Sequence, residues 1–228
     1  MLPLIAAILL CGCAAEAVFI TLESRKKFLA ALLFKGAASL LFVLAGGFAG
    51  QLTADVLYAR LILAGLLLGA VGDICLNLRF VVTMRAKAIF LVGIAAFLLG
   101  HVAYLSALAA RAPLALLYAL PVAAAAAAVV IRFVLKRVEV SGAIRIFGIV
   151  YLCIVILMAA CALALFALEP QNPGRALFAA GGLLFAASDV LLVLHQFGRR
   201  PYPAFRALNL SLYYLGQACI ALTIALMH

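Results

Sequence analysis

Two aspartates, Asp73 and Asp189, lie deep inside long apolar segments of the chain. The sequence LLGAVGDICLNL at residues 67–78 is echoed 116 residues later by LLFAASDVLLVL at residues 183–194. A carboxylate near the centre of a bilayer costs about 2.5 kcal/mol or more, so such residues usually serve a function. Neither aspartate has a basic residue three or four positions away that would neutralise it within its own helix. The matching positions therefore predict one site with two acids.

Other polar residues occur in the same apolar segments. Asn77 follows Asp73 by one helical turn and shares its face. Near the end of the chain, Asn209, Tyr213 and Gln217 recur at four-residue steps. A polar line exposed to lipid would be costly, so we expect these side chains to line one substrate-binding pocket that opens to the cytoplasmic leaflet. The remaining candidates for this lining are Glu16, Lys35, His101 and Tyr104.

Structural roles are the alternative for several of these residues. Glu16 and Lys35 could form an ion pair between adjacent helices. His101 could be satisfied by a hydrogen bond between helices, and Asn209 and Gln217 could join neighbouring helices in the same way. The structural alternative is weakest for the two aspartates.

The composition identifies the elements that must position these residues. The chain has 228 residues, of which 70% are hydrophobic and 11% are charged. A soluble domain has about half its residues apolar and about a quarter charged, so that class is excluded. Backbone groups in lipid must be satisfied within each segment, which predicts an all-α, polytopic bundle of eight transmembrane helices in a single domain, residues 1–228. The expected spans are 2–20, 28–48, 56–78, 88–109, 114–135, 143–168, 176–197 and 204–226.

The basic residues predict how the helices are oriented. Most of the seventeen Lys and Arg residues fall in or beside the odd-numbered connections. They are Arg25, Lys26, Lys27, Arg79, Arg85, Lys87, Arg132, Lys136, Arg137, Arg145, Arg199, Arg200 and Arg206. By the positive-inside rule these connections are cytoplasmic and both termini lie on the other side. The net charge of +10 therefore indicates contact with anionic membrane lipids, not nucleic acid, and we expect a bacterial inner membrane.

The offset between the aspartates also predicts internal repetition. The same 116 residues carry Leu99-Gly100-His101 onto Leu215-Gly216-Gln217. An offset of four spans gives a tandem, parallel repeat of four plus four helices. The resemblance is weak in the first two spans, where Lys35 corresponds to Tyr151.

Several kinds of chemistry lack the residues that they need. The three histidines show no HxxxH spacing, no CxxC pair is present, and no GxSxG sequence surrounds a serine. What remains is a carboxyl pair in a low-dielectric pocket, which can share a proton and act as acid and base. This chemistry requires neither a metal nor an organic cofactor.

Four short motifs resemble those of the YhhN-type lysoplasmalogenase family. They are GDICL at residues 72–76, GHVAY at 100–104, SDVLL at 188–192 and YYLGQ at 213–217. Phe34-Lys35 is also similar to that family's second span, although Gly36 stands where a proline is common. The motifs occur in the family's order and extend over nearly the whole chain.

The resemblance implies a membrane enzyme that hydrolyses the vinyl ether of lysoplasmalogens. The products would be a fatty aldehyde and glycerophosphoethanolamine or glycerophosphocholine. The family's proposed catalytic aspartates correspond to Asp73 and Asp189. We favour Asp189 as the acid because its neighbours are apolar, with Asp73 as the ionised partner and Lys35 near the substrate phosphate.

Other functions fit the same residues. A proton-coupled transporter also uses intramembrane acids and internal repeats, although such repeats are often inverted. A hydrolase of a related lysolipid, with an ester or a saturated ether, is a second alternative. A membrane scaffold without activity would not explain the buried acids. The sequence leaves the oligomeric state open.

Overall fold

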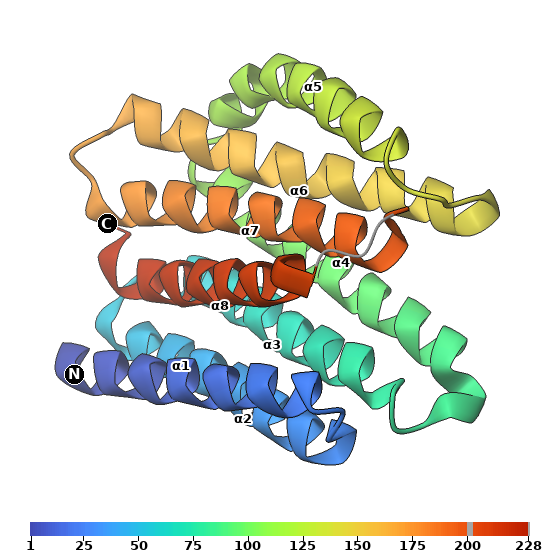
Figure 1. Cartoon of the computed structure of the whole chain (residues 1–228). Coiled ribbons are helices and arrows are strands. Elements are labelled where there is room, and N and C mark those ends of the chain that lie inside the picture. The colour runs from blue at the N-terminus through green and yellow to red at the C-terminus, as the bar shows by residue number, and fades with distance from the viewer. Residues whose placement is uncertain (200–202, 228) are drawn as a thin grey trace. The chain divides into compact units, whose positions relative to one another are not determined.

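The computed structural model describes residues 1–199 and 203–227, and within these ranges the protein is an all-α protein, as predicted. Arg200, one of the basic residues that set the predicted orientation, lies outside the described residues. The described residues contain eight long helices, coloured along the chain in Figure 1. They are α1 (Leu2–Ser24), α2 (Phe28–Ala49), α3 (Val56–Leu78), α4 (Ala86–Arg111), α5 (Pro113–Leu135), α6 (Gly142–Leu168), α7 (Pro173–Phe197) and α8 (Pro203–Leu226). Short 3-10 turns, Gly50–Leu52 and Thr83–Arg85, follow α2 and precede α4.

Residues at the helix ends explain where several helices begin. Asp55 caps α3, because its carboxylate accepts a hydrogen bond of 2.9 Å from the backbone N–H of Tyr58. Asn172 caps α7 in the same way through the N–H of Arg175, at 3.2 Å. Proline opens α1, α5 and α7, where its missing N–H costs no helical hydrogen bond.

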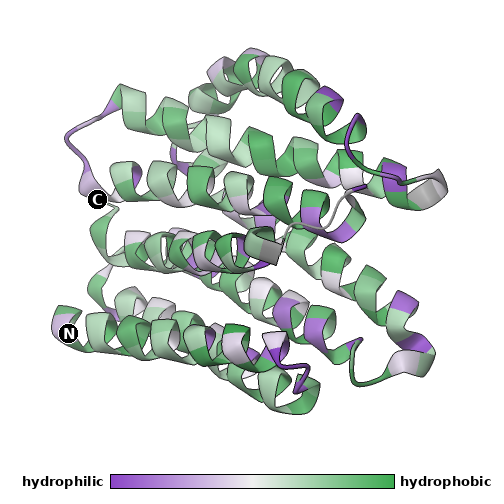
Figure 2. Ribbon diagram, in the orientation of Figure 1, coloured by the Kyte–Doolittle hydropathy of each residue, from purple (hydrophilic) through white to green (hydrophobic). Residues whose placement is uncertain are grey.

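Each of the eight helices is long and apolar enough to cross a membrane. Figure 2 shows hydrophobic residues along the helices and hydrophilic residues gathered mainly at the connections. Large apolar side chains also remain exposed, among them Leu10 at 70%, Val129 at 69% and Leu117 at 62%. A soluble protein rarely leaves so much apolar surface in water, whereas lipid accommodates it at no cost. The chain is therefore an integral membrane protein.

The chain forms two compact units. Unit 1 comprises residues 1–107 and 221–226, and unit 2 comprises residues 108–220 with Met227. In unit 1, α2 packs against α1 and against α3; in unit 2, α6 packs against α5 and against α7. The second helix of each series of four is thus flanked by its two neighbours in sequence.

Glycines bring the next pair of helices close together in both units. In unit 1, a Cβ atom on Gly100 of α4 would lie 3.2 Å from the carbonyl oxygen of Gly65 of α3. In unit 2, a Cβ atom on Gly216 of α8 would lie 3.1 Å from the carbonyl oxygen of Gly181 of α7. These two pairs are separated by the same 116 residues as the two aspartates. A repeat of whole four-helix units stays a prediction, because the sequences of the first two helices have diverged.

Candidate functional site

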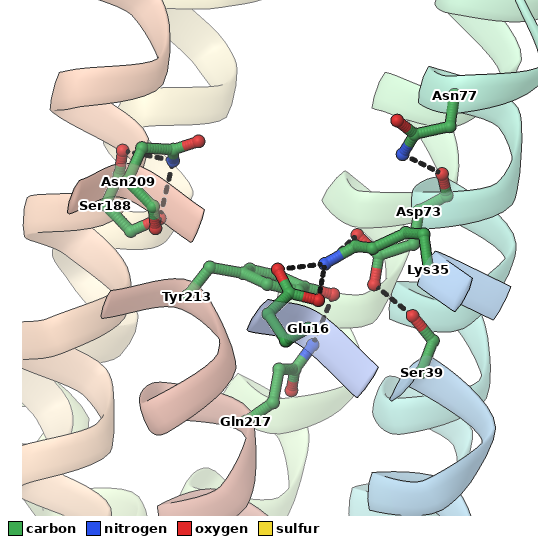
Figure 3. A network of polar contacts seen from close by, with 9 residues as sticks. All are labelled: Glu16, Lys35, Ser39, Asp73, Asn77, Ser188, Asn209, Tyr213 and Gln217. Carbon is green, nitrogen blue, oxygen red and sulfur yellow. Dashed lines mark hydrogen bonds and ion pairs between the residues drawn. The ribbon is translucent and has the colours of Figure 1, made fainter. Parts of the chain in front are cut away.

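Unit 1 contains a buried cluster of charges from three helices. Lys35 of α2 lies with its Nζ atom 3.0 and 3.1 Å from the two carboxylate oxygens of Glu16 of α1. The same Nζ atom lies 3.4 Å from Oδ1 of Asp73 of α3. Figure 3 shows the ammonium group between the two carboxylates. The helical contacts of α2 with both α1 and α3 thus bring together one cation and two acids that are far apart in the sequence.

The second oxygen of the Asp73 carboxylate is also engaged. Ser39, one turn after Lys35 on α2, donates a hydrogen bond of 2.6 Å from Oγ to Oδ2 of Asp73. Lys35 and Ser39 therefore hold the two oxygens of one carboxylate from a single face of α2. Asn77, expected from its spacing to adjoin the acid, donates to the backbone carbonyl of Asp73 at 2.9 Å and not to its carboxylate.

The burial of this cluster makes its charges significant. Lys35 is 1% exposed, and Glu16 and Asp73 are each 4% exposed. Removing such groups from water is costly, and they remain together only when they are paired and hydrogen-bonded. In the contacts described, two carboxyl groups face one ammonium, so one carboxyl group can hold a proton while the other is ionised. This property suits general acid–base chemistry.

In unit 2, Asp189 of α7 is 3% exposed and is held by a tyrosine. The hydroxyl of Tyr151 on α6 donates a hydrogen bond of 2.9 Å to Oδ2 of Asp189. This donor is a neutral hydroxyl. Each aspartate thus accepts a hydrogen bond from a hydroxyl, Ser39 for Asp73 and Tyr151 for Asp189, and Asp73 also lies beside an ammonium.

The residue before Asp189 joins α7 to α8. The side-chain amide of Asn209 donates to both the carbonyl oxygen and Oγ of Ser188, each at 2.8 Å. In return, Oγ of Ser188 donates to the carbonyl oxygen of Asn209 at 3.1 Å. Figure 3 shows this reciprocal pairing. The contact supports the structural alternative for Asn209, and it also fixes the backbone that carries Asp189.

The other two polar residues of the α8 stripe contact each other. Nε2 of Gln217 donates to the hydroxyl of Tyr213 at 3.1 Å. The ring of Tyr213 packs edge-on against Phe185 of α7, with the ring centroids 5.2 Å apart. Both residues are buried, as expected for a polar line that avoids lipid.

His101 and Tyr104 of α4 are also buried. Nδ1 of His101 lies 2.7 Å from the backbone carbonyl oxygen of Phe97, one turn earlier. The ring of Tyr104 packs against Gly65 of α3, which has no side chain to displace it. Tyr104 thus lies at the junction of α3 and α4, while the His101 contact is made within α4.

The structure groups the sequence candidates by unit. Unit 1 brings Glu16, Lys35 and Asp73 into direct contact, while unit 2 places Asn209 beside the residue preceding Asp189. Two residues with direct contacts to the aspartates were missed as site candidates, Ser39 and Tyr151. A signal for each was available, since Ser39 follows Lys35 by one helical turn and Tyr151 stands 116 residues after Lys35.

Comparisons with known proteins identify a family but no individual relative. No curated protein and no solved structure matches the chain. Residues 30–224 match the YhhN family, and this segment includes Lys35, Asp73, Tyr151 and Asp189, while Glu16 precedes it. Because the match extends over most of a chain that carries its buried acids on membrane-spanning helices, the protein belongs to the YhhN family.

Proposed function

We propose that the protein is a lysoplasmalogenase that hydrolyses the vinyl ether bond of a lysoplasmalogen by acid–base catalysis. The products are a fatty aldehyde and glycerophosphoethanolamine or glycerophosphocholine. The observation that carries the proposal is the burial of Asp73 and Asp189, 4% and 3% exposed, within the segment that matches the YhhN family. Buried intramembrane acids are retained for function far more often than for stability.

In the proposed reaction, Asp189 is the proton donor. The Tyr151 hydroxyl donates to Oδ2 of Asp189, so Oδ1 can carry the proton that is transferred. The proton is added to the vinyl carbon that does not bear the ether oxygen, and the electron pair of the double bond forms the new C–H bond. The carbon attached to oxygen becomes part of an oxocarbenium ion, which water attacks.

Asp73 is the proposed carboxylate that accepts a proton from the attacking water. The Lys35 ammonium at 3.4 Å and the Ser39 hydroxyl at 2.6 Å stabilise its negative charge. Addition of water gives a hemiacetal, whose C–O bond to glycerol then breaks. The Asp73 carboxyl gives the glycerol oxygen the proton that it took from water, the hemiacetal hydroxyl gives its proton to Asp189, and the aldehyde is released. The sum is one water consumed for one ether bond broken.

Other candidate residues have supporting roles in this proposal. Glu16 positions the Lys35 ammonium against Asp73. Asn77, His101, Tyr104, Asn209, Tyr213 and Gln217 remain the proposed polar lining for the substrate. The protein is proposed to act in a bacterial inner membrane, with both termini on the non-cytoplasmic side, because most basic residues lie in the odd-numbered connections.

Aldehyde release from a defined lysoplasmalogen by purified protein in detergent tests the proposal. A lysolipid with a saturated alkyl ether is the substrate control, because it lacks the double bond that is protonated. Asp73→Asn and Asp189→Asn are expected to lose nearly all turnover. Glu139→Gln removes an acid whose side chain is 75% exposed, and it should retain full activity.

Two outcomes would redirect the proposal. Equal turnover of an ester or saturated ether lysolipid would indicate a hydrolase of different specificity. Absence of turnover in folded protein, together with proton-dependent flux of a substrate into sealed vesicles, would indicate a transporter.

A further inference from the structure

An open cavity lies at one end of unit 2, where α5 and α7 end and α8 begins. Its volume is about 330 Å³, which is within the range of ligand pockets. Its lining combines three basic residues with apolar side chains and one glycine: Lys136, Arg137, Arg199, Phe133, Leu194, Phe205 and Gly198. None of these residues takes part in the proposed hydrolysis.

Backbone pairing fixes the position of the basic residues. The connection after α5 and the connection after α7 run antiparallel at a bridge between Val138 and Gly198. The N–H of Arg199 donates to the carbonyl oxygen of Arg137 at 3.1 Å, and the N–H of Glu139 donates to that of Phe197 at 2.9 Å. Val138 is itself buried in an apolar cluster of unit 2. Two connections that are distant in sequence thus present their cations at one cavity.

The charges around the cavity favour an anion. The Arg137 guanidinium lies 3.7 Å from the centroid of the Phe133 ring and donates to the Phe133 carbonyl oxygen at 3.2 Å, which restricts its movement. Glu139 lies 3.4 Å from Nε of Arg199 and offsets part of one charge. Because both side chains of this pair are more than half exposed, the ion pair is weak and a stronger anion can compete for Arg199.

The apolar part of the lining and the position of the cavity identify the kind of anion. Phe133, Leu194 and Phe205 offer surface to hydrocarbon next to the cations. The ends of membrane-spanning helices lie at the level of the lipid headgroups. A phospholipid carries a phosphate at this level, directly followed by glycerol and acyl carbons. Basic pockets at helix ends are a recurring form of anionic lipid recognition.

We propose that this cavity binds an anionic glycerophospholipid of the surrounding membrane. Its phosphate contacts Lys136, Arg137 and Arg199, and its glycerol backbone and first acyl carbons pack on Phe133 and Phe205. Three cations against one phosphate favour a headgroup with a net negative charge, such as phosphatidylglycerol, over zwitterionic phosphatidylcholine. The cavity lining includes none of the proposed catalytic residues, and the proposal stands whether or not the protein is a hydrolase.

Tryptophan fluorescence provides a direct test, because the chain contains no Trp. Phe205→Trp places a single reporter in the cavity. Phe80→Trp places a matched reporter beside Arg79, at another basic end of the helices. Each protein is reconstituted in phosphatidylcholine vesicles that contain a small fraction of brominated phosphatidylglycerol, which quenches nearby Trp. We expect quenching at residue 205 at lower lipid fractions than at residue 80, and weaker quenching at residue 205 by brominated phosphatidylcholine.

Charge variants in the Phe205→Trp background locate the binding residues. Lys136→Gln, Arg137→Gln and Arg199→Gln should each weaken binding about fivefold, and together on the order of a hundredfold. Lys27→Gln, Arg85→Gln and Lys87→Gln together remove as much charge from other connections and should leave quenching at residue 205 unchanged. Arg137→Lys with Arg199→Lys keeps the charge and should retain binding. Circular dichroism identifies any variant that does not fold. If a multiple variant does not fold, the test rests on Lys136→Gln alone, because the Lys136 side chain is exposed and its replacement does not disturb packing.

Three results would overturn the proposal. One is equal quenching at residue 205 by brominated phosphatidylcholine and phosphatidylglycerol. Another is an equal loss of quenching in the matched control with three other cations removed. The third is full displacement of the lipid by millimolar inorganic phosphate, because a site that recognises phosphate alone would not be a lipid site.

Discussion

The hydroxyl of Tyr151 donates a hydrogen bond of 2.9 Å to the carboxylate of Asp189. In unit 1, the residues 116 positions earlier are Lys35 and Asp73, and they are also in contact, with Nζ 3.4 Å from Oδ1. In each series of four helices, a residue at the same position of the second helix therefore contacts the aspartate of the third helix. The second-helix residue that contacts the aspartate is thus an ammonium in unit 1 and a phenol in unit 2.

Replacing Tyr151 by Phe removes this hydrogen bond and keeps the ring. We expect kcat for aldehyde release to fall about tenfold, since a hydrogen bond to a carboxyl group contributes about 1–2 kcal/mol. Because Tyr151 contacts Asp189 and is not a proposed substrate-binding residue, KM should be unchanged, while the free energy of unfolding should fall by about 1–3 kcal/mol because a buried carboxyl group loses its donor. Steady-state kinetics and unfolding in mixed micelles measure both. A rise in KM with constant kcat would assign Tyr151 to substrate binding instead.

Lys35→Met should be the most destabilising single change in the charge cluster. It removes the ammonium between Glu16 and Asp73 and leaves two buried carboxylates without their cation. Breaking a buried ion pair in this way costs about 3–5 kcal/mol. Reversible unfolding in dodecyl sulfate mixed micelles, followed by circular dichroism, gives the free energy.

A double variant separates charge from packing in this cluster. Glu16→Gln combined with Lys35→Gln removes one charge of each sign and keeps the hydrogen bond from Ser39 to Asp73. It should be less destabilised than Lys35→Met by about 1–3 kcal/mol, because it leaves one buried carboxylate instead of two. Equal losses in the two variants would mean that side-chain volume, and not charge, accounts for the role of Lys35.

Asn209 and Ser188 form a reciprocal contact that a double-mutant cycle can isolate. Asn209→Leu leaves the Ser188 hydroxyl and carbonyl without the amide, and it should cost about 1–3 kcal/mol of unfolding free energy. Adding Ser188→Ala should cost little more, because the two side chains interact with each other. Strictly additive losses would show that Asn209 acts independently of Ser188. A larger loss of kcat than of stability would show that the contact also positions Asp189.

The sequence was sufficient to predict the all-α membrane fold, because hydropathy alone identifies segments that cross lipid. The 116-residue offset found in the sequence also relates the close approach of Gly100 to Gly65 to that of Gly216 to Gly181. The partners of the aspartates were harder to predict. Ser39 and Tyr151 are common residue types on other helices, and their contacts depend on how α2 and α6 rotate about their axes. The spacing of Ser39 from Lys35 and the offset of Tyr151 point to these two positions, but neither reports the rotation of the helix.

The pair Gly181 and Gly216 provides a final test, since it sets the distance between α8 and α7, the helix that carries Asp189. A Cβ atom on Gly181 would lie 3.0 Å from the carbonyl oxygen of Gly216, which is backbone and moves only if a helix moves. Gly181→Ala should therefore destabilise the protein by about 1–3 kcal/mol through overpacking and lower kcat by displacing Asp189. Gly47→Ala is the matched control, because a Cβ atom there has no neighbour within 4 Å. In a helix, that change should be neutral or stabilise by about 0.5–1 kcal/mol. If both variants unfold alike, the close approach of α7 and α8 does not limit stability.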